Sequence, residues 1–144
     1  MHDYTTSFLT DATPDEVFAA INNVRGWWGR DVDGTNDKVG DEFTFRVQDV
    51  HYSKLRVTDL LPNEKIVWLV LDNRMNFVDD QSEWVGTMIT FEIAHDGAQR
   101  EVRFTHVGLT TEYQCFETCS NAWTSLMHGS LPSLIETGAG QPYE

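Results

Sequence analysis

The spacing of hydrophobic residues predicts one long amphipathic helix in the last third of the chain. Between residues 111 and 138, apolar side chains recur at steps of three and four, the period of a helix with one buried face. Thr111 and Gln114 are spaced for a capping box at its start, and Gly138 suits the left-handed position that follows a helix. The apolar positions are Cys115, Phe116, Cys119, Ala122, Trp123, Leu126, Met127, Leu131, Leu134 and Ile135. Such a face needs a large apolar surface to cover, which the preceding residues must provide.

Alternation of apolar and polar residues predicts that the middle of the chain forms consecutive β-strands. The predicted strands cover residues 42–48, 51–61, 65–71, 87–94 and 101–106. His95-Asp96-Gly97-Ala98 separates the last two, and Asp-Gly is a strong hairpin signal. Residues 72–83 are polar and irregular, so we expect a mobile loop there. Because hairpins join antiparallel neighbours, these strands are expected to form one antiparallel sheet.

The first forty residues combine a strand with two short helices. Residues 4–9 alternate and are predicted to form the opening strand. Thr13 and Pro14 suit the N-cap and the first position of a helix. Trp27-Trp28 follows between glycines, and at least one of these large rings is expected to face inward. Residues 31–41 are expected to form a loop containing one short strand. Segregated helices and strands define an α+β fold, here as a single domain over residues 1–144.

The composition restricts the classes of partner. Hydrophobic residues make up 40% of the 144 positions, which indicates a globular rather than a disordered chain. Ten basic residues against 23 acidic ones give a formal charge of −13, which disfavours nucleic acid and anionic membrane surfaces as partners. The acidity either maintains solubility, the interpretation we prefer, or suits a basic partner protein.

Neither a membrane span nor an export signal is expected. No apolar run approaches about 18 residues, and residues 1–4 lack the basic and apolar regions of a signal peptide. Two cysteines, four positions apart on a predicted helix, do not make the disulfide framework of a secreted protein. We therefore predict a cytoplasmic protein. The sequence contains no zinc-spaced cluster or phosphate-binding glycine loop, so no cofactor or metal is predicted.

An ordered set of short motifs resembles the activator of heat-shock-protein ATPase homologues, a branch of the superfamily that includes START lipid-transfer domains and polyketide cyclases. The motifs are residues 13–18 (TPDEVF), Trp27-Trp28, residues 40–45 (GDEFTF), 62–67 (PNEKIV), 105–108 (THVG), Trp123, Ser130-Leu131 and residues 136–138 (ETG). The resemblance covers nearly the whole chain. It implies a helix-grip fold, in which a curved antiparallel sheet of about six or seven strands surrounds the C-terminal helix and leaves a cavity. This fold hosts several functions, so the resemblance selects none of them.

The implied cavity would be lined mainly by aromatic and aliphatic side chains from the sheet, the tryptophan pair and the helix. The candidate ligand-binding residues are Trp27, Trp28, Phe43, Phe45, Leu55, Trp68, Ile89, Phe91, Phe104, His106, Cys119, Trp123 and Met127. A wall of aromatic residues with few polar groups is typical of small-molecule pockets. The alternative is that these side chains meet and fill the space completely.

Three features of the sequence allow two interpretations each. His106 is the one imidazole that strand alternation directs toward the helix, either as a general base in a cavity or as a core histidine bound to a neighbouring hydroxyl. Cys115 and Cys119 suggest a metal site, but two buried thiols are the preferred interpretation. Pro132 lacks the N–H that the carbonyl of His128 would accept, so we expect either a kink or an early end of the helix.

Three functions follow from these observations. The preferred one is a carrier or sensor that binds a small hydrophobic molecule, a lipid or an aromatic metabolite. The second is a cofactor of a heat-shock chaperone or a stress-response protein, as the resemblance implies. The third is a cyclase or hydratase that uses His106 as base, assisted by Tyr52 or Tyr113. Either a monomer or a homodimer is expected.

Overall fold

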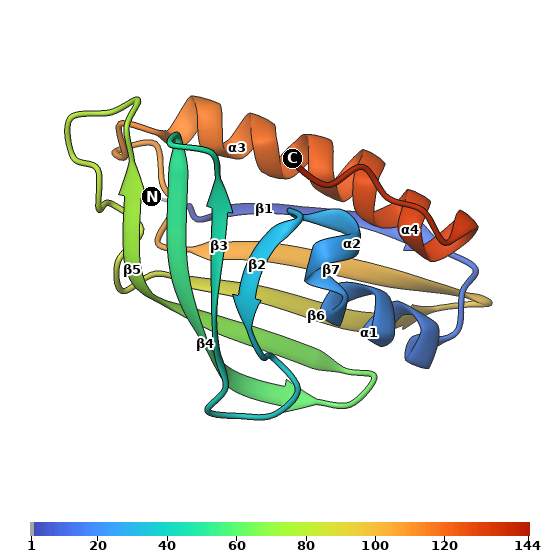
Figure 1. Cartoon of the computed structure of the whole chain (residues 1–144). Helices are drawn as coiled ribbons and strands as arrows, with labels where there is room; N and C mark the ends of the chain where they lie inside the picture. The colour runs from blue at the N-terminus through green and yellow to red at the C-terminus, as the bar shows by residue number, and fades with distance from the viewer. Residues whose placement is uncertain (1) are drawn as a thin grey trace.

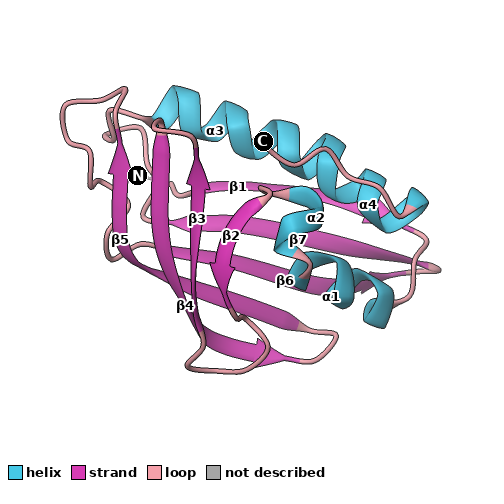
Figure 2. Ribbon diagram, in the orientation of Figure 1, coloured by secondary structure: helices cyan, strands magenta, loops and turns pink. Residues whose placement is uncertain are grey.

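A single bent antiparallel sheet with helices on one side makes up the computed structural model, which describes residues 2–144 (Figures 1 and 2). The strands are β1 (Tyr4–Thr10), β2 (Asp31–Gly34), β3 (Glu42–Val47), β4 (His51–Leu61), β5 (Lys65–Met75), β6 (Met88–Asp96) and β7 (Gln99–Val107). Their order across the sheet is β1-β7-β6-β5-β4-β3-β2, and every neighbouring pair is antiparallel. The register of β4 against β5 shifts twice, and such irregularities increase the local bend of a sheet. The predicted α+β helix-grip fold is confirmed.

Two groups of helices cover the sheet. The first is α1 (Pro14–Asn22) with α2 (Val24–Trp27), and the second is α3 (Phe116–Ser125), a π-helical segment (Leu126–Ser130) and α4 (Leu131–Thr137). Thr13 caps α1 in a full capping box with Glu16. The last three segments run on as one long rod along the upper side of the sheet in Figure 1, while α1 and α2 lie at the end of the sheet near α4. Among residues 2–144, no helix combines the length and apolar character needed to cross a membrane.

The start of the long helix differs from the sequence expectation. Helix α3 begins at Phe116, and residues 111–115 form turns, so the capping box predicted from Thr111 and Gln114 is wrong. The carboxylate of Glu83, in the connection between β5 and β6, instead accepts hydrogen bonds from the backbone N–H groups of Gln114 (2.7 Å) and Cys115 (3.1 Å). A distant acidic side chain therefore takes the place of a local cap, which local sequence patterns cannot reveal.

Pro132 does not end the helix, and the irregularity near it is a π-helical turn rather than a gap between two helices. The turn before it, Leu126–Ser130, is π-helical, and the N–H of Leu131 donates to the carbonyl of Leu126. In a π-helical turn each N–H donates to the carbonyl five residues earlier. This shifted pairing lets the helix continue although Pro132 has no N–H to donate. The helix then continues to Thr137 and is followed by Gly138 in the predicted left-handed conformation (φ 83°).

The expected loop over residues 72–83 begins later than its polar sequence indicates. Strand β5 continues to Met75, and its last four residues pair with β4 from His51 to Lys54. Asn73 is buried there because its side-chain amide donates to the Tyr52 carbonyl and to the Ser53 hydroxyl (both 3.1 Å). A polar residue can occupy an inward strand position when its hydrogen bonds are satisfied. The loop predicted from polarity alone was therefore wrong for the residues that extend β5.

The core lies between the inner face of the sheet and the helices. The inward positions predicted from alternation on β3, β4, β6 and β7 are buried, with Val47 and Ile93 half-buried. Trp27, Trp68, Phe91 and Phe104 meet mainly edge to face, with ring centroids 5.2–5.8 Å apart. Such contacts stabilise the fold beyond the burial of apolar area. This part of the space between sheet and helix is therefore filled by side chains.

Candidate functional site

A cavity of about 170 Å³ lies beneath α3. In Figure 1 the turn between β3 and β4 approaches the N-terminal end of this helix. The wall of the cavity is almost entirely apolar and consists of Trp28, Phe45, Val47, Val50, His51, Phe77, Trp84, Thr118, Cys119, Ala122, Trp123, Leu126 and Tyr143. Val50, Phe77 and Tyr143 are 41%, 40% and 37% exposed, so the cavity reaches the surface at their side chains. Thr118 is also exposed, and the deep part of the wall is formed by buried side chains such as Trp28, Phe45 and Trp123.

Four aromatic rings form the deep wall of the cavity. Trp28 stacks on Phe45 with ring centroids 4.0 Å apart and lies 5.2 Å from Trp123. Trp123 in turn stacks on Trp84 at 5.9 Å with nearly parallel planes. Trp28 directly follows α2, and the other rings come from β3, α3 and the β5–β6 connection, so the cavity forms only when all four segments are in place. Flat rings around a small apolar space are suited to hold another flat, apolar molecule.

The cavity has one titratable imidazole in its wall, that of His51. Its Nε2 forms a 2.8 Å hydrogen bond with the hydroxyl of the buried Ser53, and its ring meets Trp84 and Phe45 edge to face. Burial lowers the pKa of His51 to about 4. The imidazole is therefore neutral near pH 7 and adds no charge to the apolar wall.

His106 lies beside the cavity wall but not in it. It is fully buried, and Trp123 donates its indole N–H to Nδ1 (3.1 Å) while the Thr87 hydroxyl lies 2.8 Å from Nε2. Burial, with a smaller contribution from the nearby His51, lowers the pKa of His106 to about 3. Both ring nitrogens are thus occupied by protein groups, which is the arrangement of a core histidine. In this state His106 offers no free nitrogen to a molecule in the cavity.

The structure divides the sequence-predicted site residues into two sets. Trp28, Phe45, Cys119 and Trp123 line the cavity. The others lie in the filled core and do not line it: Trp27, Phe43, Leu55, Trp68, Ile89, Phe91, Phe104, His106 and Met127. All thirteen are buried, so the positions that strand alternation directed inward, such as Phe43, Phe91 and Phe104, are confirmed as core positions. That any of them binds a ligand stays a prediction.

Nine other cavity residues were not predicted as site residues, and four of them lie outside the periodic stretches. Trp84 and Phe77 belong to the irregular β5–β6 connection, and Val50 lies in the turn between two strands. Tyr143 lies on the C-terminal tail, which returns along the helix and is joined to the segment after α2 (Figure 1). There the Tyr143 N–H donates to the Trp28 carbonyl and the Arg30 N–H donates to the Tyr143 carbonyl (both 3.0 Å). For Phe77, Trp84 and Tyr143, the one signal in the sequence was a large aromatic residue in a polar stretch.

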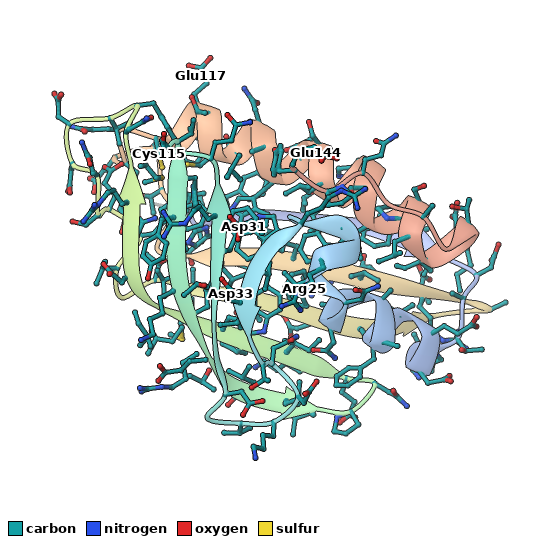
Figure 3. All side chains as sticks on the ribbon, viewed as in Figure 1. Arg25, Asp31, Asp33, Cys115, Glu117 and Glu144 are labelled. Carbon is teal, nitrogen blue, oxygen red and sulfur yellow. The ribbon has the colours of Figure 1, made fainter. Side chains whose placement is uncertain are left out.

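The two cysteines are buried next to the cavity, as the preferred interpretation predicts. Cys115 and Cys119 are free thiols with 1% and 4% exposure. Figure 3 labels Cys115 at the start of α3, beside the connection from β5 to β6. Within residues 2–144, no three side chains of His, Cys, Asp or Glu come together as a metal site. Cys119 forms part of the cavity wall.

Comparisons with known proteins agree with this architecture. A family model for activator of Hsp90 ATPase homolog 1-like proteins matches residues 11–136. The Aha1 dimer from Colwellia psychrerythraea, solved in solution, is similar with a TM-score of 0.78 and 26% identity, over 97% of this chain and 100% of that one. No protein in the search of curated proteins matches the chain.

More distant structures share the fold alone. The Staphylococcus saprophyticus protein SSP2350 has a TM-score of 0.73 and 17% identity, over 99% of this chain and 98% of its own. DynU16, a putative protein in the dynemicin biosynthetic locus, has a TM-score of 0.73 and 14% identity, over 99% of this chain and 51% of its own. Since the family model covers most of the sequence, from the start of the first helix region to the end of the long helix, this chain belongs to the family of activator of Hsp90 ATPase homolog 1-like proteins.

Proposed function

We propose that the protein binds a small aromatic molecule in the cavity beneath α3 and acts as its carrier or sensor. The observation that carries this proposal is an apolar cavity of about 170 Å³ that reaches the surface and is walled by stacked aromatic rings. Its one titratable imidazole, His51, is neutral near pH 7 because its pKa is about 4. The free thiols are consistent with a reducing compartment, and we propose a cytoplasmic location.

The volume of the cavity selects between the two ligand classes that the sequence left open. An engineered protein cavity of about 150 Å³ lined by aliphatic and aromatic residues binds benzene. A cavity of about 170 Å³ therefore has room for one aromatic ring with a few substituents, whereas most of a long acyl chain would lie outside it, in contact with water. Hence we favour an aromatic metabolite over a lipid.

Native mass spectrometry of freshly purified protein tests whether a small molecule copurifies, and it reports the number of subunits. In parallel, thermal unfolding with benzene, phenol and indole as probes measures binding. Saturation at about 100 times the dissociation constant should stabilise the folded state by about 2.7 kcal/mol. A fatty acid serves as the size control and should produce no shift. Absence of a shift with every aromatic probe would count against the proposal.

A cavity-filling variant localises the binding. Ala122→Leu adds bulk directly into the cavity and should abolish the shift with aromatic probes. Asn121→Leu is the matched control, because Asn121 lies next to Ala122 on α3 but is exposed. If both variants bind the probes as the wild type does, then binding occurs elsewhere.

A second proposed function is supported by the family and by the 26% identical relative solved as the Aha1 dimer. In this proposal the protein forms a homodimer or contacts a chaperone ATPase of the Hsp90 class. Purified chaperone and purified protein should form a complex in size-exclusion chromatography, and ATP turnover should rise with the added protein. A single subunit in native mass spectra, together with unchanged turnover, would remove this candidate.

A further inference from the structure

We propose that a hollow on the outer face of the sheet, remote from the helices, binds the phosphate group of a small phosphorylated molecule. The hollow has a volume of about 250 Å³. The residues that line it all have polar side chains: Arg46, Gln48, Asp49, His51, Tyr52 and Arg74. This composition contrasts with the apolar wall of the cavity beneath α3.

The register of the sheet places two arginines on either side of one tyrosine. Arg46 on β3 pairs with Tyr52 on β4, and Tyr52 pairs with Arg74 on β5, which are adjacent strands (Figure 1). Directly paired residues project from the same face of a sheet, and the sequence neighbours Phe45 and Met75 are buried on the inner face. The three residues therefore form one row across the outer face. Since adjacent strands lie about 4.8 Å apart, the backbones of the two arginines are about 10 Å apart.

Neither arginine of this row is neutralised by an ion pair. Within residues 2–144 the ion pairs use other basic residues, namely Arg30, Lys54, Arg56 and Arg103. Arg46 and Arg74 are exposed and have no carboxylate partner in this part of the chain, although acidic residues outnumber basic ones by 23 to 10. Two unpaired guanidinium groups on one hollow of so acidic a protein form a site for an anion.

Tyr52 holds one of these guanidinium groups in place. The guanidinium carbon of Arg46 lies over the Tyr52 ring, 4.8 Å from its centroid. This cation–π contact uses the face of the guanidinium group, so the N–H groups in its plane stay available. Their planar fork matches the oxygen atoms of a phosphate group. Arg46 is therefore ordered before a ligand arrives, which lowers the entropic cost of binding.

The turn between β3 and β4 completes the hollow with an unusual backbone conformation. Gln48 has a φ of 47°, in the left-handed region that residues other than glycine seldom adopt. Backbone strain of this kind occurs preferentially at binding sites, and the side-chain amide of Gln48 is a further donor for a phosphate oxygen. Asp49 is the one carboxylate among the lining residues. The hollow thus combines two positive charges with one negative charge.

These local charges select the class of ligand. At physiological ionic strength, exposed charges more than about 8 Å apart are largely screened, so the formal charge of −13 acts only weakly on a small anion in the hollow. A phosphate monoester carries a charge of about −1.5 to −2 and offers three oxygens to two guanidinium groups, whereas one carboxylate satisfies a single guanidinium fork. A nucleic acid would bring further phosphates against the acidic surface, so a small molecule fits better.

Titration of the nitrogen-15-labelled full-length protein with glycerol 3-phosphate, followed by the NMR signals of the backbone amides, tests the proposal. We expect saturable shifts at residues 46–52 and 74, and an affinity that decreases with added salt. Glycerol is the uncharged control and should cause no saturable shift. Arg46→Gln and Arg74→Gln should each weaken binding by about tenfold, because each removes a charged hydrogen-bond donor.

Arg103→Gln is the matched control, because Arg103 is also an exposed arginine on a strand of this sheet but is paired with Glu101 at 2.6 Å. It should bind glycerol 3-phosphate as the wild type does, and the dispersion of the NMR spectrum verifies that each variant is folded. Absence of saturable shifts in the wild type would overturn the proposal, and so would equal weakening by Arg103→Gln and Arg46→Gln. The probe has no aromatic ring, so failure here is independent of the proposed binding in the cavity.

Discussion

The space between the sheet and the long helix has two regions that use the same kinds of residue with different results. In the filled region, defined by Trp27, Trp68, Phe91, Phe104 and His106, rings meet edge to face and leave no room. In the cavity region, defined by Trp28, Phe45, His51, Trp84 and Cys119, the rings form a wall around about 170 Å³. Aromatic content alone therefore does not distinguish a filled core from a cavity.

The two regions differ in the size of the side chains that pack against the aromatic rings. In the filled region, large side chains of adjacent strands, such as Phe91 and Phe104, lie side by side, and Trp27 from α2 packs edge to face on Phe91. In the cavity region, the long helix presents Thr118 and Ala122, which are too small to reach the opposite wall. The outer boundary there consists of a turn, a loop and the C-terminal tail rather than strands. The volume of the opposing side chain thus decides where the space remains open.

The largest expected effect separates the two regions by stability. Phe91→Ala in the filled region should lower the free energy of unfolding by about 3–5 kcal/mol, because it leaves a void in closely packed surroundings. Phe77→Ala, at the exposed rim of the cavity, should change it by less than about 1 kcal/mol. Urea unfolding measures both values. Equal losses would show that the rim is as rigidly packed as the core.

A pH titration tests the neutral histidine in each region. The pKa values of His51 and His106 fall from 6.5 to about 4 and about 3 in the folded protein, so only the unfolded chain takes up protons as the pH drops below 6.5. Stability should therefore fall with decreasing pH, by about 3–4 kcal/mol in total from about pH 7 to about pH 5. Urea midpoints at several pH values measure this loss.

The control for the titration is a histidine at an exposed position. A His51→Gln/His106→Gln double variant should lose most of the pH dependence, whereas His95→Gln, in the exposed end of β6, should keep it. If the free energy of unfolding of the double variant still falls as the pH decreases, then groups other than these two histidines cause the pH dependence.

A hydrogen bond in the filled region provides a third, smaller test. Thr87→Val removes the hydroxyl that lies 2.8 Å from His106 Nε2 and leaves that nitrogen buried without a partner. We expect a loss of about 1–3 kcal/mol in the free energy of unfolding. Thr90→Val, three positions further along in β6 and half-buried, is the control and should change stability little. Equal effects would mean that the hydroxyl of Thr87 is not specifically required.

The smallest expected effect concerns the cap that holds the cavity end of the helix. Glu83→Gln keeps an acceptor for the Gln114 and Cys115 N–H groups but removes the charge at the helix N-terminus. The loss should be about 1 kcal/mol and should shrink in high salt. Glu136→Gln, in the last turn of α4, should not destabilise the protein. A salt-independent loss in Glu83→Gln would contradict the electrostatic explanation.

The fold could be predicted from the sequence because its elements have clear periods. Alternation placed Phe43, Phe45 and Phe91 on the inner face, and steps of three and four placed Trp123 on the buried face of the helix. The position of the cavity could not be predicted, because it depends on which side chains face one another between the sheet and the long helix. Trp84 and Tyr143 come from irregular segments, and no local pattern relates them to Trp28.

The C-terminal tail has a practical consequence for anyone who handles this protein. Residue 143 forms backbone hydrogen bonds with Trp28 and Arg30 and also borders the cavity, and Glu144 pairs with Arg30 at 3.0 Å. An affinity tag fused directly after residue 144 would lie close to the rim of the cavity and could displace Tyr143 from its contacts. A purification tag should be attached before β1 instead, so that binding measurements are made with the contacts of Tyr143 intact.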